Sequence, residues 1–242
     1  IQIDARIWMG SYAFTATPGK VGEAVRSLLL KDYGVPVTQT LIALVVERLT
    51  DFFAVLFLLI VNMPLLLNLD VPLIVPLSIS IVAVFAGLLG LRNSWTKNKL
   101  LQIARVILPR KLSSAGGGSL IVLRHLLKPE VLLPCTLISV TAWSMEGVCL
   151  WMLLKAMQIH DVGIMGAIFA HTTAGLLGAL SLLPGGIGTT EASTYALLAL
   201  QGVPMDKAIP ATLLIRLMTL WFSTVLGIIC LWGWKSRSIN QA

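Results

Sequence analysis

Charged residues are scarce in this chain. Only 12% of its 242 residues are Asp, Glu, Lys or Arg, 57% are hydrophobic, and the mean hydropathy is +0.88. Soluble domains carry about 25% charged residues, so the composition excludes a soluble fold and indicates a polytopic membrane protein. Cysteine is also rare: Cys135, Cys149 and Cys230 lie in apolar runs. Their number is odd and no spacing suits a metal, so we interpret them as small buried hydrophobic residues.

Acidic residues are absent from the stretch Arg92–Lys128, which contains eight Lys or Arg residues. In membrane proteins such an excess lies in cytoplasmic loops, so we expect this stretch to be cytoplasmic. The same rule accounts for the net charge of +7 without any nucleic acid as a partner. From Val162 to Thr190 the only ionisable side chain is that of His171.

Two Pro-Gly stretches interrupt the apolar sequence, and their residues correspond. Thr17–Ala24 reads TPGKVGEA, and Leu183–Ala192 reads LPGGIGTTEA with two extra residues. The correspondence continues with Gly34-Val35-Pro36 and Gly202-Val203-Pro204, then Arg48-Leu49 and Arg216-Leu217. Arg48 lies as many residues after Pro36 as Arg216 lies after Pro204. An ordered series of matches indicates an internal repeat rather than two coincidental loops.

The longest apolar runs predict the membrane-spanning helices. They are Leu41–Leu66, Val71–Leu91, Val131–Met157 and Ala208–Trp234. With the basic stretch inside, the two repeats have opposite orientations and the C-terminus is cytoplasmic. Val162–Leu200 and Ile1–Tyr33 then enter the membrane and return on the same side, each broken at its Pro-Gly stretch. In the hairpin Ile1–Tyr33, Lys20–Leu30 is predicted to be a short amphipathic helix. In the hairpin Val162–Leu200, the corresponding helix is Ala192–Leu200.

The predicted fold is an all-α polytopic membrane protein with inverted repeats, about five long transmembrane helices and two re-entrant Pro-Gly helical hairpins. We expect a single transmembrane domain over residues 1–242, with repeat one at 1–91, a cytoplasmic basic linker at 92–128 and repeat two at 129–237. Ile1–Trp8 resembles mid-protein sequence, so we expect the natural N-terminus to lie upstream. Inverted repeats with interrupted helices are typical of secondary transporters.

Two intramembrane arginines need partners. A charge at the bilayer centre costs about 2.5–3.5 kcal/mol on insertion scales, so Arg48 and Arg216 should be paired. Repeat symmetry predicts Glu23 and Glu191 as the partners, and additional carboxylates are those of Glu47, Asp51 and Glu146. The pairs could lock the hairpins to the spanning helices. They could also line a polar cavity for a charged headgroup, with free backbone N–H groups after Gly22 and Gly188 available to an anion.

No nucleophile–base pair and no metal-ligand spacing is evident, so we expect no catalytic residues, no metal and no cofactor. His171 lies on an apolar face. It is interpreted either as a packed, hydrogen-bonded histidine or as a proton relay, and the sequence favours the first.

The motifs PGKVGEAVR, VERLTDF, LPGGIGTTEA and LLIRL resemble those of the lysylphosphatidylglycerol synthase/flippase transmembrane family, which includes the membrane part of the bacterial multiple peptide resistance factor. The resemblance covers nearly the whole chain. It implies a membrane protein that handles phospholipids or lipid-linked headgroups. The predicted headgroup site comprises Gly19, Lys20, Gly22, Glu23, Arg26, Glu47, Arg48, Asp51, Gly185, Gly186, Gly188, Glu191 and Arg216. No aminoacyl-transferase domain follows Ala242, so lysine transfer to lipid is not expected of this chain.

The leading hypothesis is a flippase-like lipid transporter in a bacterial or archaeal plasma membrane. An alternative is a membrane subunit or enzyme of lipid-linked glycosyl or aminoacyl transfer, and a third is a scaffold that anchors a partner through the basic linker. The expected partners are a phospholipid or lipid-linked substrate, the membrane, a second copy of the chain and a lipid-modifying enzyme, but no nucleic acid.

Overall fold

The computed structural model describes residues 2–18, 21–62 and 118–232. Within these ranges the chain is all-helical, and the only β-type pairing there is one isolated bridge. The all-α prediction is therefore confirmed for this part of the chain. The predicted span Val71–Leu91, most of the basic linker, and the site residues Gly19 and Lys20 lie outside the described residues.

The first unit, residues 2–62, is a helical hairpin followed by a long helix. Helix α1 (Gln2–Ser11) and the 3₁₀ turn η1 (Tyr12–Phe14) lead to the Pro-Gly stretch. The 3₁₀ turn η2 (Val21–Ala24) and α2 (Val25–Lys31) lead back, and α3 (Val37–Val61) follows. The predicted single helix Lys20–Leu30 is wrong in its first turn, where the N–H of Gly22 bonds to the Thr17 hydroxyl at 2.7 Å and holds a tighter turn.

The long helix of the first unit, α3, ends before the C-terminal end of the predicted helix Leu41–Leu66. It ends at Val61, because the amide of buried Asn62 donates to the Leu58 carbonyl at 2.7 Å and closes the last turn. Pro64 follows two positions later in the sequence, and helices commonly stop just before a proline.

The second unit, residues 164–231, repeats this order. It comprises α10 (Ile164–Leu180), α11 (Thr189–Leu200) and a continuous helix over Met205–Leu231. The continuous helix consists of α12 (Met205–Arg216), the π-helical stretch η3 (Leu217–Trp221) and α13 (Phe222–Leu231). Helices α8 (Gly118–Leu126) and α9 (Pro129–Ala156) precede it. Helix α11 begins at Thr189 rather than at the predicted Ala192, because the side chain of Glu191 caps it.

The turns after the two short helices have the same geometry. Gly34 and Gly202 both have positive φ, +81° and +84°, which glycine adopts without steric cost. In each turn the N–H after the glycine bonds to the carbonyl five residues back, at 3.2 and 3.1 Å, as in a Schellman motif. Pro36 and Pro204 then start the long helices. The internal repeat in the sequence is thus a repeat of local structure.

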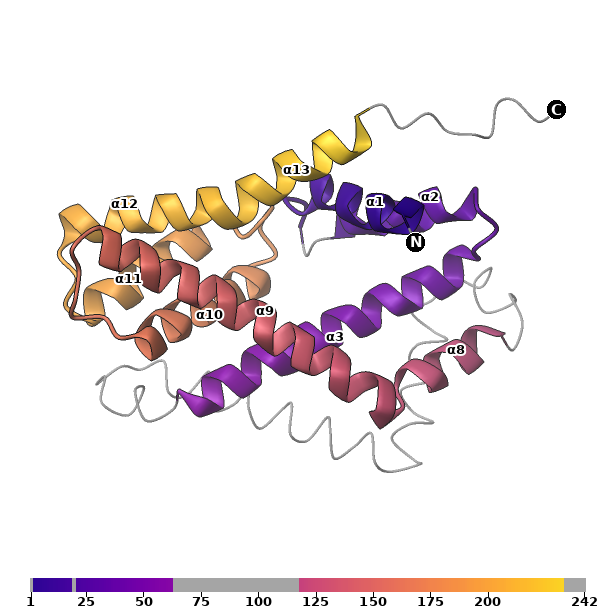
Figure 1. The fold of residues 1–242 in the computed structure, drawn as a ribbon, viewed down its shortest axis with the longest axis horizontal. Coiled ribbons are helices and arrows are strands. Elements are labelled where there is room, and N and C mark those ends of the chain that lie inside the picture. Colours follow the sequence, from indigo (N-terminus) through magenta and orange to yellow (C-terminus); the bar gives the residue numbers. More distant parts are fainter. Residues whose placement is uncertain (1, 19–20, 63–117, 233–242) are drawn as a thin grey trace.

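Each hairpin packs against the long helix of both units. Helix α3 packs on α2 of its own hairpin and on α10 of the other, whereas the second long helix packs on α11 and, through α13, on α1 and η1 (Figure 1). The contact between α13 and η1 is very close: a Cβ added at Gly227 would lie 2.1 Å from the backbone nitrogen of Ala13. The two hairpins lie toward opposite ends of the long axis (Figure 1).

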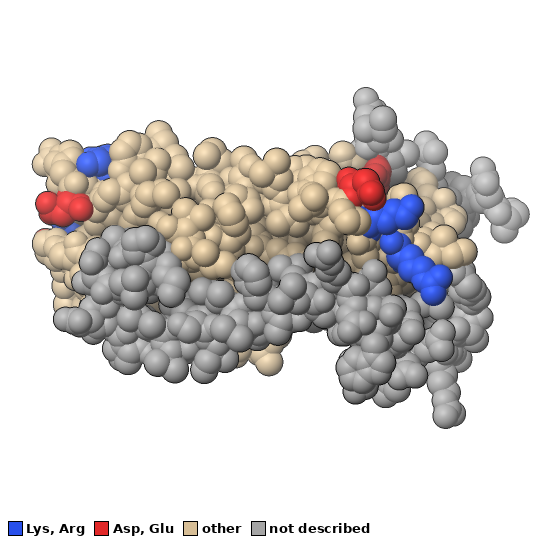
Figure 2. Space-filling model, turned by 90° about the horizontal axis from the view of Figure 1, so that it is seen from below, with Lys and Arg blue, Asp and Glu red and all other residues tan. Residues whose placement is uncertain are grey.

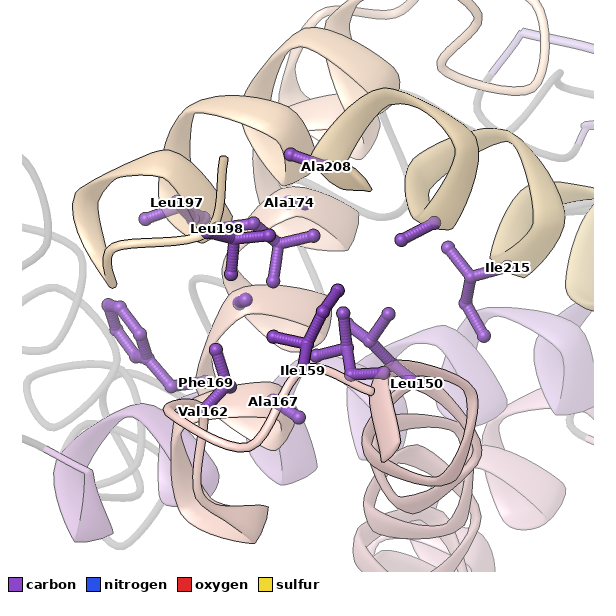
Figure 3. Close-up of a cluster of buried hydrophobic side chains, with 14 of the residues drawn as sticks. Leu150, Ile159, Val162, Ala167, Phe169, Ala174, Leu197, Leu198, Ala208 and Ile215 are labelled. Carbon is purple, nitrogen blue, oxygen red and sulfur yellow. The ribbon is translucent and has the colours of Figure 1, made fainter. Parts of the chain in front are cut away.

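The hydrophobic core lies between α9, the second unit and the adjoining half of α3. Side chains of α9, α10, α11 and α12 meet there, with Leu150, Phe169 and Leu198 fully buried (Figure 3). Helix α9 runs beside both α10 and α3 and connects the second hairpin to the first unit's long helix.

The described part of the chain exposes many large apolar side chains. Helix α9 exposes Leu133, Leu137 and Met152, among others. On the face in Figure 2, the described charged side chains lie near the two ends of the long axis, and the described residues visible between them are neither Lys, Arg, Asp nor Glu. Two helices, α9 and the one over Met205–Leu231, are long and apolar enough to cross a membrane. The number of crossings and the re-entrant path of the hairpins stay predictions.

Candidate functional site

The two Pro-Gly stretches meet. Pro18 and Pro184, which correspond in the repeat, form an isolated antiparallel bridge. Antiparallel contact between equivalent residues is what a twofold relation between two units produces. Gly185 has φ +59°, and a Cβ there would lie 3.2 Å from Leu220 and 3.4 Å from the Cα of Ala16. Only glycine combines this conformation with so close an approach. The hairpin tips therefore form one of the junctions between the units, beside the contacts of α3 with α10 and of α13 with α1 and η1.

In the second unit, Arg216 joins the long helix to the hairpin tip. Its Nε donates to Glu191 Oε1 at 2.6 Å, and its Nη2 donates to the Gly185 carbonyl at 2.6 Å. The second oxygen of Glu191 accepts the Gly188 N–H at 2.7 Å, so the carboxylate also caps α11. The π-helical stretch begins directly after Arg216, and such stretches often mark functional sites.

In the first unit, Arg48 takes the corresponding position within a larger cluster. Its guanidinium lies 2.7 Å from Glu47, 3.3 Å from Asp51 and 3.6 Å from Glu23. Glu47 also accepts a bond from Arg26. The first charged cluster, as we call it, consists of Glu23, Arg26, Glu47, Arg48 and Asp51. The sequence-predicted pairs Glu23–Arg48 and Glu191–Arg216 are thus both present.

The two charged sites differ in composition and exposure. Positions 168 residues after Arg26, Glu47 and Asp51 hold Thr194, Ile215 and Thr219, so the second unit keeps only its ion pair. The Arg48 side chain is 32% exposed, against 12% for Arg216. The first cluster has three carboxylates for two guanidinium groups and more access from outside. It is the better candidate for a binding site, and Glu191–Arg216 is the better candidate for a structural lock.

The N–H groups of the two tip glycines are bonded: Gly188 donates to Glu191, and Gly22 donates to Thr17. Among the N–H groups after them, that of Thr190 donates to the Gly186 carbonyl at 2.9 Å, and the availability of the others to an anion stays a prediction. Gly186 has φ +64° and packs against Gly178 and Thr190 in the turn of the second hairpin. The described glycines of the predicted site therefore shape the tips, and the side chains supply the charge.

A cavity of about 270 Å³ opens beside the first cluster, between α1, α2 and α3. Charged and polar lining comes from Asp4, Arg26, Thr40 and Glu47, and apolar lining from Ile7, Trp8, Leu30 and Ala43. Sequence reasoning found two of the charged residues, Arg26 and Glu47, but missed Asp4, Trp8 and Thr40. Asp4 and Trp8 have no counterpart in the second unit's motif, so the repeat gave no signal for them. A smaller cavity of about 210 Å³ borders Glu191 and Tyr195.

The two repeat-related glutamates are poorly placed for acid–base chemistry. Both oxygens of Glu191 are held, by Arg216 and by the Gly188 N–H. Glu23 is 2% exposed, accepts from the Thr15 hydroxyl at 3.1 Å and faces Arg48. A catalytic carboxylate must reach its substrate. This geometry does not favour Glu23 or Glu191 as a catalytic group.

Glu146, which sequence analysis offered as a further partner for the arginines, bonds to His171. The two side chains lie 2.8 Å apart, Nε2 to Oε2, where α9 crosses α10. The expectation of a packed, hydrogen-bonded histidine is confirmed.

Comparison with known proteins extends this description. The family model described as the lysylphosphatidylglycerol synthase TM region matches residues 5–227. A UPF0104 membrane protein of Methanocaldococcus jannaschii is 25% identical over 219 residues, covering 86% of this chain and 88% of that protein. Another, from Methanothermobacter thermautotrophicus, is 33% identical over 93 residues, 38% of this chain and 28% of that protein. No solved structure matches. The chain therefore belongs to the lysylphosphatidylglycerol synthase transmembrane family of membrane proteins.

Proposed function

We propose that this protein is a flippase-like lipid transporter, which binds the headgroup of a phospholipid or lipid-linked substrate and moves it between leaflets. The observation that carries the proposal is the cavity between α1, α2 and α3, with Asp4, Arg26 and Glu47 in its lining. Intramembrane ionisable residues that line a cavity mark a substrate path by default. Membership of a lipid-handling family supports the same assignment.

The cavity suits a headgroup and not a whole lipid. Pockets that enclose a drug-sized ligand measure about 300–1,000 Å³, and this one, at about 270 Å³, is smaller. Arg26 offers guanidinium N–H donors to a phosphate, while Asp4 and Glu47 accept bonds from hydroxyl or amine groups. The acyl chains would stay outside, against the exposed apolar side chains of the long helices.

Movement would come from the junction of the two hairpin tips. Proline has no backbone N–H, so neither Pro18 nor Pro184 can donate a backbone hydrogen bond across their contact. Each hairpin packs against the other unit's long helix, so rocking of one unit moves the tip of the other. Rocking of inverted repeats about a central site is the usual basis of alternating access.

A dithionite assay in vesicles tests the proposal. The protein is reconstituted into phosphatidylglycerol–phosphatidylethanolamine vesicles that carry tracer lipids labelled with NBD on an acyl chain. Arg26→Gln and Glu47→Gln each remove a charge from the cavity. Loss of one charge-assisted hydrogen bond to the headgroup costs about 1.5–3 kcal/mol, so we expect flipping about 10- to 100-fold slower.

Matched controls remove the same charges elsewhere. Arg124 and Glu130 are exposed and lie outside the cavity, so Arg124→Gln and Glu130→Gln should flip lipid at the wild-type rate. Circular dichroism and gel filtration establish that each variant is folded. The proposal would be contradicted if the cavity variants flipped lipid at the wild-type rate. It would also be contradicted if the wild-type protein flipped the tracer lipids no faster than protein-free vesicles do.

A further inference from the structure

The second long helix contains one wide turn that the first long helix lacks. Residues Met205–Leu231 form one continuous helix (Figure 1), but its stretch η3, Leu217–Trp221, is π-helical. The corresponding helix of the first unit, α3, is α-helical from Val37 to Val61. A π turn closes with an i→i+5 hydrogen bond, so it holds one residue more than an α turn. The difference lies directly after Arg216, where the two repeats otherwise match.

The sequence identifies the extra residue as Met218. LTDFFA follows Arg48, and LMTLWFS follows Arg216. If Met218 is skipped, the two stretches share the leucine, the threonine, two aromatic positions and a small residue. Without the skip they share only the leucine and one aromatic position. In the skipped register Asp51 corresponds to Leu220, which is also uncharged, so the second unit still keeps only its ion pair.

Two side-chain hydrogen bonds support the same register. The hydroxyl of Thr50 donates to the Glu47 carbonyl at 2.8 Å, and that of Thr219 donates to the Ile215 carbonyl at 2.9 Å. Each carbonyl belongs to the residue just before the repeat-related arginine. The bond spans three residues in the first unit and four in the second. The two threonines are therefore equivalent, and the second helix has gained one residue between its arginine and its threonine.

The inserted turn separates two parts of the helix that pack on different hairpins. Before it, α12 packs on α11 of the second hairpin, and after it, α13 packs on α1 and η1 of the first hairpin. The turn also lies at the tip of the second hairpin. A Cβ added at Gly185 would lie 3.2 Å from Leu220, and the Gly185 carbonyl accepts the bond from Arg216. A bend in this turn would thus act on the tip directly.

We propose that the inserted turn η3 is the hinge at which the two hairpins change their relative angle. Sharp helix kinks occur typically at π-bulges, where the regular ladder of i→i+4 bonds is interrupted. Bending at η3 carries α13 with the first hairpin and α12 with the second, and so opens the contact between Pro18 and Pro184. Helix α3 also packs on both hairpins but is regular, so the bend is confined to one side. The link from this bend to lipid movement rests on the proposed function.

Deletion of Met218 tests the insertion without any transport assay. It should convert η3 to a regular α turn and leave Gly227 against Ala13, because the residues beyond the turn keep their register. We therefore expect a folded protein that resists denaturant at least as well as the wild type. Deletion of exposed Val45 from α3, which has no extra residue, is the matched control. It turns the following residues by about 100°, brings Glu47 to a buried position and should lower the denaturation midpoint.

Spin labels measure the angle between the hairpins. With the native cysteines replaced by alanine, one pair of labels is placed at exposed Leu28 of α2 and exposed Leu200 of α11. A control pair at Leu180 and Leu200 lies within the second hairpin. Double electron–electron resonance in nanodiscs should give a narrower distance distribution between the hairpins after deletion of Met218 and an unchanged one for the control pair. Met218→Ala keeps the turn and removes only a half-exposed side chain, so it should behave as wild type.

Lipid flipping is then compared in the vesicle assay. Bending a regular helix breaks about one backbone hydrogen bond, so we expect deletion of Met218 to slow flipping roughly tenfold and Met218→Ala to leave it unchanged. A Met218 deletion as destabilising as the Val45 deletion would overturn the insertion, and an unchanged distribution between the hairpins would overturn the hinge. If the distribution narrows but the wild type flips no lipid, the hinge stands and the proposed function fails. If lipid flips at the wild-type rate without Met218, the proposed function stands and the link between hinge and transport fails.

Discussion

The double variant of Glu191 and Arg216 gives the sharpest test of how the second hairpin is held. Arg216→Met removes the guanidinium, with its bonds to Glu191 and to the Gly185 carbonyl, both 2.6 Å long. Removing one partner of a buried ion pair costs about 3–5 kcal/mol, because the other charge is left uncompensated. With side chains 12% and 23% exposed, the lower end applies, so we expect a loss of about 3 kcal/mol.

Glu191→Gln keeps an oxygen that can accept the Gly188 N–H but loses the charge, so it separates the ion pair from the helix cap. In the double variant neither charge is left alone. The double variant should therefore lose about 2 kcal/mol less stability than the sum of the losses in the two single variants.

Denaturant titration in mixed micelles, followed by circular dichroism, measures all four proteins. A loss of about 3 kcal/mol corresponds to a folded-to-unfolded ratio roughly a hundredfold lower, which this assay resolves. If Arg216→Met is within 1 kcal/mol of wild type, or if the two losses add, Glu191–Arg216 is not the lock inferred here.

Three further predictions concern the close contacts between the units. Gly227→Ala forces a Cβ to within 2.1 Å of the η1 backbone and should lower stability by about 1–3 kcal/mol in the same titration, whereas Gly163→Ala, with nothing within 4 Å, should change it little. Gly185→Ala should cost about 1–2 kcal/mol for its positive φ and more for the crowding at the junction; a neutral result would refute the backbone argument. With the native cysteines replaced by alanine, cysteines at Pro18 and Pro184 should form a disulfide, since bridged residues lie within its Cα–Cα range, and the cross-link should stop flipping. Absence of the cross-link on oxidation would place the tips apart, and full flipping with the cross-link intact would refute their separation during transport.

The internal repeat made much of this arrangement predictable. The Glu23–Arg48 and Glu191–Arg216 pairs follow from one spacing that occurs twice, because two copies of a unit fold alike. The positions of Gly34 and Gly202 follow in the same way, since each ends a short helix with a positive φ.

Features that break the repeat escaped prediction. Asp4 and Trp8 line the cavity from a helix whose sequence has no counterpart in the second unit's motif. The bond between Glu146 and His171 joins helices whose contact depends on tertiary packing, and no local pattern encodes it. The capping of α11 by Glu191 was missed because the same carboxylate had already been assigned to Arg216. Single-sequence reasoning allots each side chain one partner, whereas this carboxylate has two.

The close fit of Gly227 against η1 has a consequence for how the protein is made. The first hairpin leaves the ribosome before α13, the helix that packs against it, has been made. Gly10 and Gly227, both on this contact, are 217 residues apart, since 227 − 10 = 217. At about 5–20 residues per second, the newly made hairpin waits roughly 10–40 s before its cover exists. During that interval the surface that Gly227 later contacts lacks this partner, and a chain truncated before α13 would never acquire it.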